Sequence, residues 1–239
     1  MLTIADQLGI LKQLQTVDSA IYRLRRELAV KPHTIETLRA ELAAQRQQLA
    51  ALEERSTTLQ MQRKNRELEL ATQEDKVKKL QAQLFQVKTN KEYTAMQHEI
   101  EGAKADGSLL EEMIIRLLED MDQVQQQVIR AKAEWQQREV QTQQDVRRIE
   151  GEIAQVQQDL QRTEADRQRL APSLEPGVLA TYDRILRSHD GLALVPLMGE
   201  ACGGCHMVLP PQIINEVAQQ TRIVNCETCA RLLYAPDEP

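Results

Sequence analysis

Apolar residues recur at alternating steps of three and four through most of residues 1–171, and polar residues fill the positions between them. A repeat averaging about 3.5 residues keeps one apolar seam of a helix facing a partner helix, which is typical of a left-handed coiled coil. Independent amphipathic helices in a globule would need a wider apolar stripe and more turns. The series are Ile10 to Leu28, Ile35 to Leu59, Leu70 to Val87, Met96 to Trp135 and Val146 to Leu160.

Three interruptions organise this apolar pattern. Pro32 is predicted to break the first helix, because proline lacks an N–H group and clashes with the preceding turn. Thr89 and Glu92 have the spacing of a capping box, which indicates the start of a new helix. The apolar phase also slips by about one residue between Trp135 and Val146.

These interruptions fit an antiparallel hairpin formed within one chain. If the tip of the hairpin lies near residues 86–91, the numbers of opposing residues add to about 177, and Pro32 falls opposite residue 145, inside the phase slip. Each arm is then interrupted where the other is. A turn within Gly102–Gly107 is an alternative position for the reversal, and a parallel dimer is the alternative assembly. We therefore expect a mostly α protein with a long antiparallel coiled-coil hairpin, which carries a break near residue 32.

The C-terminal part of the chain has a different composition. Pro172, Pro176 and Gly177 end the helical pattern, and a short docking helix is predicted to follow. The predicted domains are thus a coiled-coil hairpin over 1–171 and a small domain over 172–239. Within the small domain we expect helix at 178–188, strand at 192–197 and a short helix at 210–217 that begins with proline.

All four cysteines of the chain lie in this small domain, as Cys202-Gly-Gly-Cys205 and Cys226-Glu-Thr-Cys229. A two-residue spacer lets both thiolates of one Cys-x-x-Cys knuckle bind the same ion, and two knuckles supply the four ligands of tetrahedral zinc. A complete set of sulfur ligands leaves no place for water, which favours a structural role. The sequence predicts a zinc ribbon with one Zn²⁺ per chain, and iron is the alternative metal. Two disulfides or a redox dithiol fit less well, because no helical pattern follows either knuckle.

Composition and charge limit the classes of function that the chain can have. The 239-residue chain has one Phe, one Trp and four Tyr, too few for a large globular core. Residues 172–239 have a net charge of −4, which does not favour non-specific binding of nucleic acid. No secretory signal and no membrane-spanning run is evident, so with reduced thiols we expect a cytoplasmic protein. The four histidines have no paired nucleophile, and we expect that the protein is not an enzyme.

Several motifs resemble those of bacterial proteins in which a long helical hairpin precedes a C4-type zinc ribbon. They are Ala201-Cys-Gly-Gly-Cys205, Leu209-Pro-Pro-Gln212, the ending Cys226-x-x-Cys229-x-Arg231-Leu-Leu-Tyr234, and the tip segment Asn90 to Ile100. Some members of that family bind sigma-54 and regulate flagellar genes or type III secretion. The resemblance implies a regulatory or adaptor protein that binds protein partners, as a monomer or weak dimer. At least one member is linked to messenger RNA through basic residues of its ribbon, whereas the ribbon here is acidic, so nucleic-acid binding is the alternative function.

Two groups of residues are predicted to contact partners. Phe85 lies beside the apolar seam, and Lys88 and Lys91 flank the predicted turn. An exposed aromatic side chain between cations is a plausible docking point, because aromatic residues concentrate binding energy. The alternative is a well-capped turn with a semi-buried Phe85. In the ribbon, Arg222 and Arg231 are the corresponding candidates.

Overall fold

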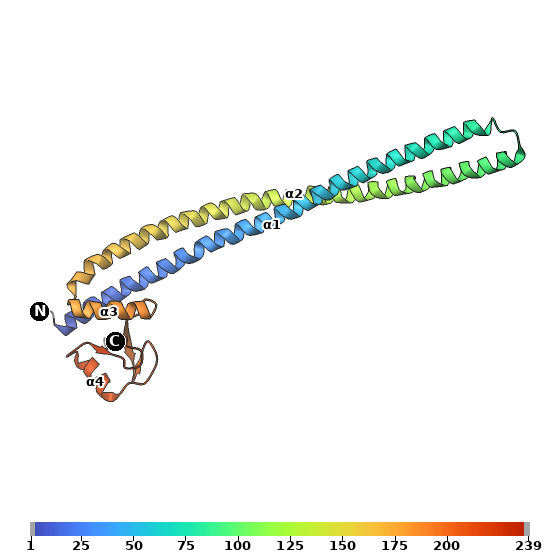
Figure 1. Cartoon of the computed structure of the whole chain (residues 1–239). Helices are drawn as coiled ribbons and strands as arrows, with labels where there is room; N and C mark the ends of the chain where they lie inside the picture. The colour runs from blue at the N-terminus through green and yellow to red at the C-terminus, as the bar shows by residue number, and fades with distance from the viewer. Residues whose placement is uncertain (1–2, 237–239) are drawn as a thin grey trace. The chain divides into compact units, whose positions relative to one another are not determined.

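A computed structural model describes residues 3–236 and shows a mostly helical chain (Figure 1). Helix α1 (Ile4–Leu84) and helix α2 (Asn90–Leu170) are 81 residues each and form a hairpin joined by residues 85–89. The predicted fold class is confirmed. Helix α2 runs through both Gly102 and Gly107, so the alternative turn at those glycines is wrong. None of the described helices combines the length and apolar composition that a bilayer crossing needs.

A small mixed region follows the hairpin. Its sheet has the strand order β2-β1-β4-β3, in which β1 pairs antiparallel with β2 and parallel with β4, and β3 pairs antiparallel with β4. The elements are η1 (Ala171–Ser173), α3 (Pro176–Ser188), β1 (Leu194–Met198), β2 (Ala201–Cys202), α4 (Pro211–Gln219), β3 (Val224–Asn225) and β4 (Leu232–Tyr234).

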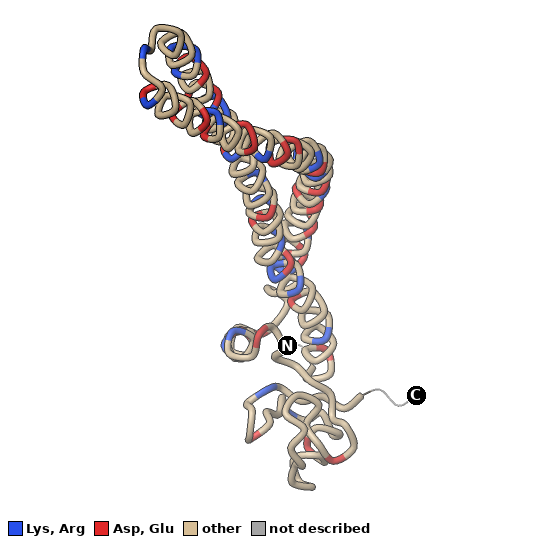
Figure 2. The backbone as a smooth tube through the Cα atoms, turned by 90° about the vertical axis from the view of Figure 1, so that its right-hand side faces the viewer, with Lys and Arg blue, Asp and Glu red and all other residues tan. Residues whose placement is uncertain are grey.

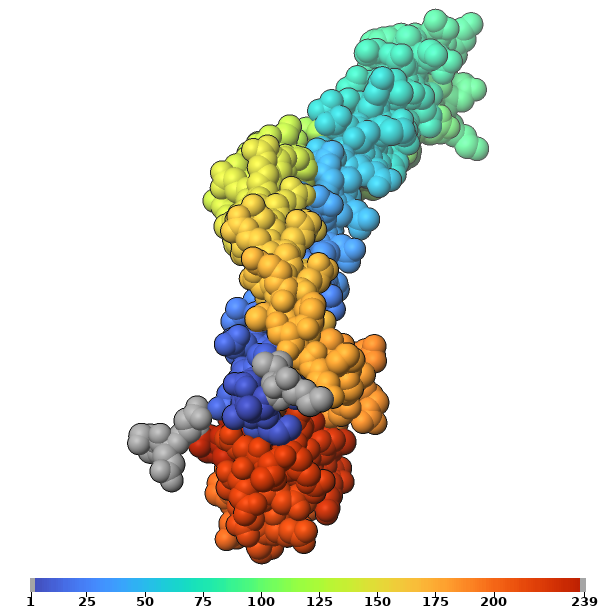
Figure 3. Space-filling model, turned by 90° about the vertical axis from the view of Figure 1, so that its left-hand side faces the viewer, coloured from blue at the N-terminus to red at the C-terminus, as the bar shows by residue number. Residues whose placement is uncertain are grey.

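Contacts divide the chain into two compact units, one of Met1–Glu36 with Val146–Pro239 and one of Thr37–Asp145. This division differs from the predicted domain boundary between residues 171 and 172. The reason is a shared core: Leu11 and Leu14 of α1 are fully buried in the same cluster as Tyr182 of α3 and Leu232 of β4. Figure 3 shows the first turns of α1, in blue, against the ribbon, in red. The ribbon therefore has a core of its own, which includes Val195, Val217 and Leu233, and it also shares a second core with the first turns of α1.

Helix α1 continues through Pro32, so the predicted break at that residue is wrong. A proline inside a helix removes one hydrogen bond and costs about 3 kcal/mol. Its neighbours hold the helix in place, because Lys31 Nζ donates to Glu152 Oε2 at 2.6 Å and Ile35 is only 8% exposed. The boundary between the two compact units follows Glu36, close to this proline. The sequence interruption thus marks the limit of a unit and not the end of a helix.

The seam of the unit Thr37–Asp145 follows the predicted antiparallel pairing. A Cβ atom placed on Gly107 would lie 3.8 Å from Leu70 Cδ1, and these two residue numbers add to 177. Further from the turn, the guanidinium of Arg46 lies 5.4 Å from the centre of the Trp135 ring, a pair whose numbers add to 181. Both contacts lie within about one helical turn of the predicted pairing.

Gln15 fixes the chain where it enters β1. Its Nε2 donates to Gly191 O at 2.7 Å, and its Oε1 accepts from the N–H groups of Ala193 and Leu194 at 2.8 and 2.9 Å. Gly191 has a φ of +87°, and a Cβ atom there would lie 2.4 Å from Cγ of Tyr22. Only glycine fits this close approach to α1.

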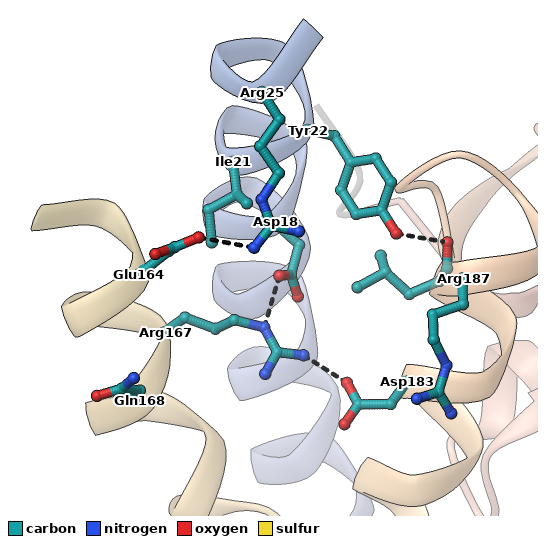
Figure 4. Close-up of a pocket in the computed structure, with 10 residues that line it drawn as sticks. Asp18, Ile21, Tyr22, Arg25, Glu164, Arg167, Gln168, Asp183 and Arg187 are labelled. Atoms are coloured by element: carbon teal, nitrogen blue, oxygen red, sulfur yellow. Dashed lines mark hydrogen bonds and ion pairs between the residues drawn. The ribbon is translucent and has the colours of Figure 1, made fainter. Parts of the chain in front are cut away.

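A charged network joins α1, α2 and α3 (Figure 4). Asp18, only 2% exposed, accepts from Arg167 Nε at 2.6 Å and from Tyr182 Oη at 3.0 Å, and Arg167 also donates to Asp183. Burial raises the pKa of Asp18, although the hydrogen bonds from Arg167 and Tyr182 act in the opposite direction. One guanidinium thus serves two carboxylates, and removing Arg167 would leave Asp18 buried without a counter-ion.

Candidate metal centre and hairpin tip

The two Cys-x-x-Cys knuckles have the same backbone geometry. In each, the N–H that follows the second cysteine donates to the carbonyl of the first: His206 to Cys202 and Ala230 to Cys226, both at 2.8 Å. His206 and Ala230 have φ angles of 61° and 60°, in the left-handed region. This turn folds the chain back after each knuckle, so that both sulfur atoms of the knuckle face the same point.

The four cysteine sulfurs form a compact cluster suited to a metal ion. All four lie within 4.8 Å of one another, with Sγ–Sγ distances of 3.8 Å for Cys202 and Cys229 and 3.7 Å for Cys205 and Cys226. A tetrahedron with zinc–sulfur bonds of about 2.3 Å has edges of about 3.8 Å. A disulfide would need a separation of about 2.0 Å, and all four cysteines are free. The cluster is a C4 zinc site for one Zn²⁺ per chain, as predicted.

Hydrogen-bond donors around the sulfurs favour the thiolate form that zinc requires. Gly204 N–H donates to Cys202 Sγ at 3.4 Å, although burial raises the pKa of Cys202 to about 12. Burial also acts to raise the pKa of Cys229, but hydrogen bonds from the backbone and side chain of Arg231, together with those from Cys205 and Cys226, outweigh it and lower that pKa to about 7. The residues therefore fit a site in which positive charge partly balances four thiolates.

Arg231, which was predicted to contact a partner, is partly buried and has contacts within the ribbon. Its Nε donates to Leu192 O at 2.9 Å, and its side chain packs against Gly204, where an added Cβ would lie 2.7 Å from Arg231 Cδ. Arg231 thus bridges the two knuckles. Arg222, the other ribbon candidate, is 64% exposed, but its guanidinium pairs with Glu216, with Nε 3.1 Å from Oε2. Both cations already have partners within the domain.

The hairpin tip, residues 85–91, exposes its aromatic side chain. Phe85 is 90% exposed, so the interpretation of a semi-buried Phe85 is wrong, and Lys88 and Lys91 are exposed as well. The turn is nevertheless capped, because Thr89 Oγ1 accepts from Glu92 N–H at 3.3 Å and donates to Glu92 Oε2 at 2.7 Å. The three predicted tip residues therefore lie in one short, capped segment.

Some residues that shape the centre could not be found from the sequence. His189, at the end of α3, lies with Nε2 2.7 Å from the carbonyl oxygen of Cys229, and Gln15 holds the strand that leads to the first knuckle. Each contact joins residues 40 or more positions apart. A single polar residue in a helical pattern gives no signal of such a distant partner.

Comparisons with known proteins agree with this architecture. Residues 201–233 match the family of C4-type zinc ribbon domains, and residues 14–190 match the family of CT398-like coiled coil hairpin domains. Among curated proteins no significant match is found.

Three solved structures share the fold over 98% of this chain and 99% of theirs. CT398 from Chlamydia trachomatis is 24% identical with a TM-score of 0.84, and the HP0958 protein from Helicobacter pylori is 23% identical with a TM-score of 0.62. A protein from Mycobacterium smegmatis is 18% identical with a TM-score of 0.73. At these identities the likeness shows the fold alone.

Proposed function

Because this chain belongs to the family of CT398-like coiled coil hairpin proteins and carries a C4-type zinc ribbon, we propose that it is a non-enzymatic adaptor or regulatory protein that binds other proteins. The observation that carries the proposal is Phe85, a large aromatic side chain that is 90% exposed in the turn of the hairpin. Folding gains nothing from leaving such a side chain in water, whereas burial of an aromatic residue contributes strongly to protein interfaces.

The two parts of the molecule have different tasks in this proposal. The hairpin presents its tip on long, regular helices, so that little order has to be gained when a partner binds. The zinc supplies folding free energy to a ribbon too small to fold on an apolar core alone. The resemblance described above makes sigma-54 and components of flagella or secretion systems the first partners to test, in the cytoplasm.

Nucleic-acid binding through the ribbon is the less favoured function. Arg222 pairs with Glu216, and Arg231 donates to Leu192 O and packs against Gly204 of the first knuckle. Residues 172–239 carry a net charge of −4. A phosphate backbone would therefore have to displace existing ion pairs and overcome repulsion.

The test is a binding measurement with the purified, zinc-loaded chain and purified sigma-54 from the same organism, followed by capture from native lysate. Phe85→Ala should weaken partner binding without a change in helicity or zinc content. Met61→Ala is the matched control, because Met61 is a 63% exposed apolar residue on α1 outside the tip. If Phe85→Ala captures every partner as well as Met61→Ala and the unaltered chain do, the tip is not the binding surface.

A further inference from the structure

Charge is distributed unevenly along the hairpin. Residues 76–98 contain five lysines and one glutamate, a net charge of +4, in a chain whose net charge is −6. The rest of the chain therefore carries −10. Figure 2 shows acidic and basic residues interleaved along α1 and α2. The sequence around the turn, in contrast, is basic. The lysines are Lys76, Lys78, Lys79, Lys88 and Lys91.

Most of these lysines have no carboxylate partner. The only acidic residue of the segment, Glu92, accepts the hydroxyl of Thr89 in the helix cap. Lys78 Nζ lies 3.4 Å from Asp75, and both side chains are about 70% exposed. Within residues 3–236, no carboxylate pairs with Lys76, Lys79, Lys88 or Lys91. Elsewhere on the hairpin, some cations reach across to the other helix, as in the 2.8 Å pair of Arg138 with Glu41 and the 2.6 Å pair of Lys31 with Glu152.

Apolar surface lies in the middle of this basic segment. Phe85 is 90% exposed and Tyr93 is 45% exposed. Both belong to a stretch in which α1 ends at Leu84 and α2 begins at Asn90, so the backbone on each side is fixed by a long helix. An aromatic anchor surrounded by charged residues has the organisation of an interface core and its rim.

From this juxtaposition we propose that the tip binds a protein whose docking surface is acidic and contains an apolar pocket for Phe85. The inference rests on the proposed function and specifies the chemistry of the partner. Carboxylates on the partner would pair with the free lysines, which steers the encounter and sets its salt dependence. The side chain of Phe85, which nothing in the described chain covers, would supply most of the affinity.

The extent of the basic segment favours a compact protein surface over a polyanion. Acidic residues bound it on both arms, Glu74 and Asp75 before it and Glu99 and Glu101 after it. RNA and anionic membranes present negative charge over long distances and would meet these carboxylates as well. The segment also contains no arginine, the side chain best suited to phosphate.

The test places a photoreactive benzophenone amino acid at position 85 of the full chain in its native cell. Cross-linked peptides are then identified by mass spectrometry. We expect adducts with a protein segment enriched in Asp and Glu. A synthetic peptide of that segment should bind the purified, zinc-loaded chain, and the affinity should fall about 30-fold with Phe85→Ala, the size expected of a central aromatic anchor.

Charge variants then test the acidic docking surface of the partner separately from the proposed adaptor function. Lys79→Gln, Lys88→Gln and Lys91→Gln together should weaken the peptide about tenfold at physiological salt, and the same three changes to Arg should not. The triple variant Lys64→Gln, Lys104→Gln, Lys132→Gln is the matched control, because these three lysines are exposed outside the segment. Amidation of the peptide's carboxylates should reproduce the loss seen with the glutamine variants.

Each alternative result of the cross-linking experiment overturns a different part of the proposal. A neutral or basic partner segment that still depends on Phe85 would overturn the acidic partner and leave the adaptor function standing. Adducts with RNA or lipid would overturn the protein partner. An adduct with residues 172–239 of a second copy, which carry −4, would show self-association instead. The absence of any adduct would overturn both the inference and the proposed role of the tip.

Discussion

Gly191 offers a sharp test of how the ribbon is attached to α1. An alanine there would place Cβ 2.4 Å from Cγ, 2.6 Å from Cδ2 and 2.9 Å from Cβ of Tyr22, and the residue would keep a φ of +87°. The unfavourable φ costs an L-residue about 1–2 kcal/mol. Displacing the ring, which also donates from Oη to Leu186 O, adds about 1–3 kcal/mol of overpacking. Gly191→Ala should therefore destabilise its unit by about 2–5 kcal/mol.

A second glycine separates the two causes. Gly199 has a φ of +62° but no atom within 4 Å of an added Cβ, so Gly199→Ala should cost only the backbone strain of about 1–2 kcal/mol. Hydrogen exchange of β1 and β4 in increasing urea reports the stability of this unit. The fluorescence of Trp135, in the unit Thr37–Asp145, should not change. Equal costs for the two glycines would refute the argument that Tyr22 packs against Gly191.

Three further predictions follow from the same structure. Removal of zinc with a chelator should abolish hydrogen-exchange protection in 194–234, whereas the far-UV circular dichroism of the two 81-residue helices should be largely retained. A full loss of helicity on zinc removal would contradict this prediction. Arg231→Gln should weaken zinc binding about tenfold in competition with a chromophoric chelator, as loss of an outer-shell partner does, whereas Arg222→Gln should leave it unchanged. Arg167→Met should lower the free energy of unfolding by about 3 kcal/mol in denaturant titrations, because it leaves Asp18 buried beside Asp183. Arg25→Met breaks only a surface pair with Glu164 and should cost less than about 1 kcal/mol in the same titrations.

The sequence was most informative where the structure depends on local patterns. A 3.5-residue repeat defines a helix and its buried face without knowledge of the partner, and a two-residue spacer fixes the direction of two thiolates. The hairpin and all four metal ligands could therefore be predicted. The capping residue Thr89 was also evident, since a helix cap involves residues only three positions apart.

Long-range contacts were not predictable in the same way. Gln15 meets Ala193 across 178 positions, and Arg167 meets Asp18 across 149. Such pairs depend on the register of the whole hairpin. Pro32 shows the converse error, because a residue that disfavours a helix in isolation is tolerated when packing and ion pairs hold both sides. The grouping of the ribbon with the first turns of α1 follows from the same distant contacts.

The role of a basic residue beside a thiolate cluster has to be judged from its partners. Four thiolates around Zn²⁺ leave a net charge of −2, so a neighbouring cation lowers the energy of the loaded site. Arg231 has this position, because its Nε donates to Leu192 O, its side chain packs against Gly204 of the other knuckle, and it lowers the pKa of Cys229. A guanidinium with these partners cannot also bind a phosphate without weakening the centre that holds the ribbon together. Within the described residues, Lys88 and Lys91 at the tip have no such partners, and this difference supports the proposal that partners bind at the tip.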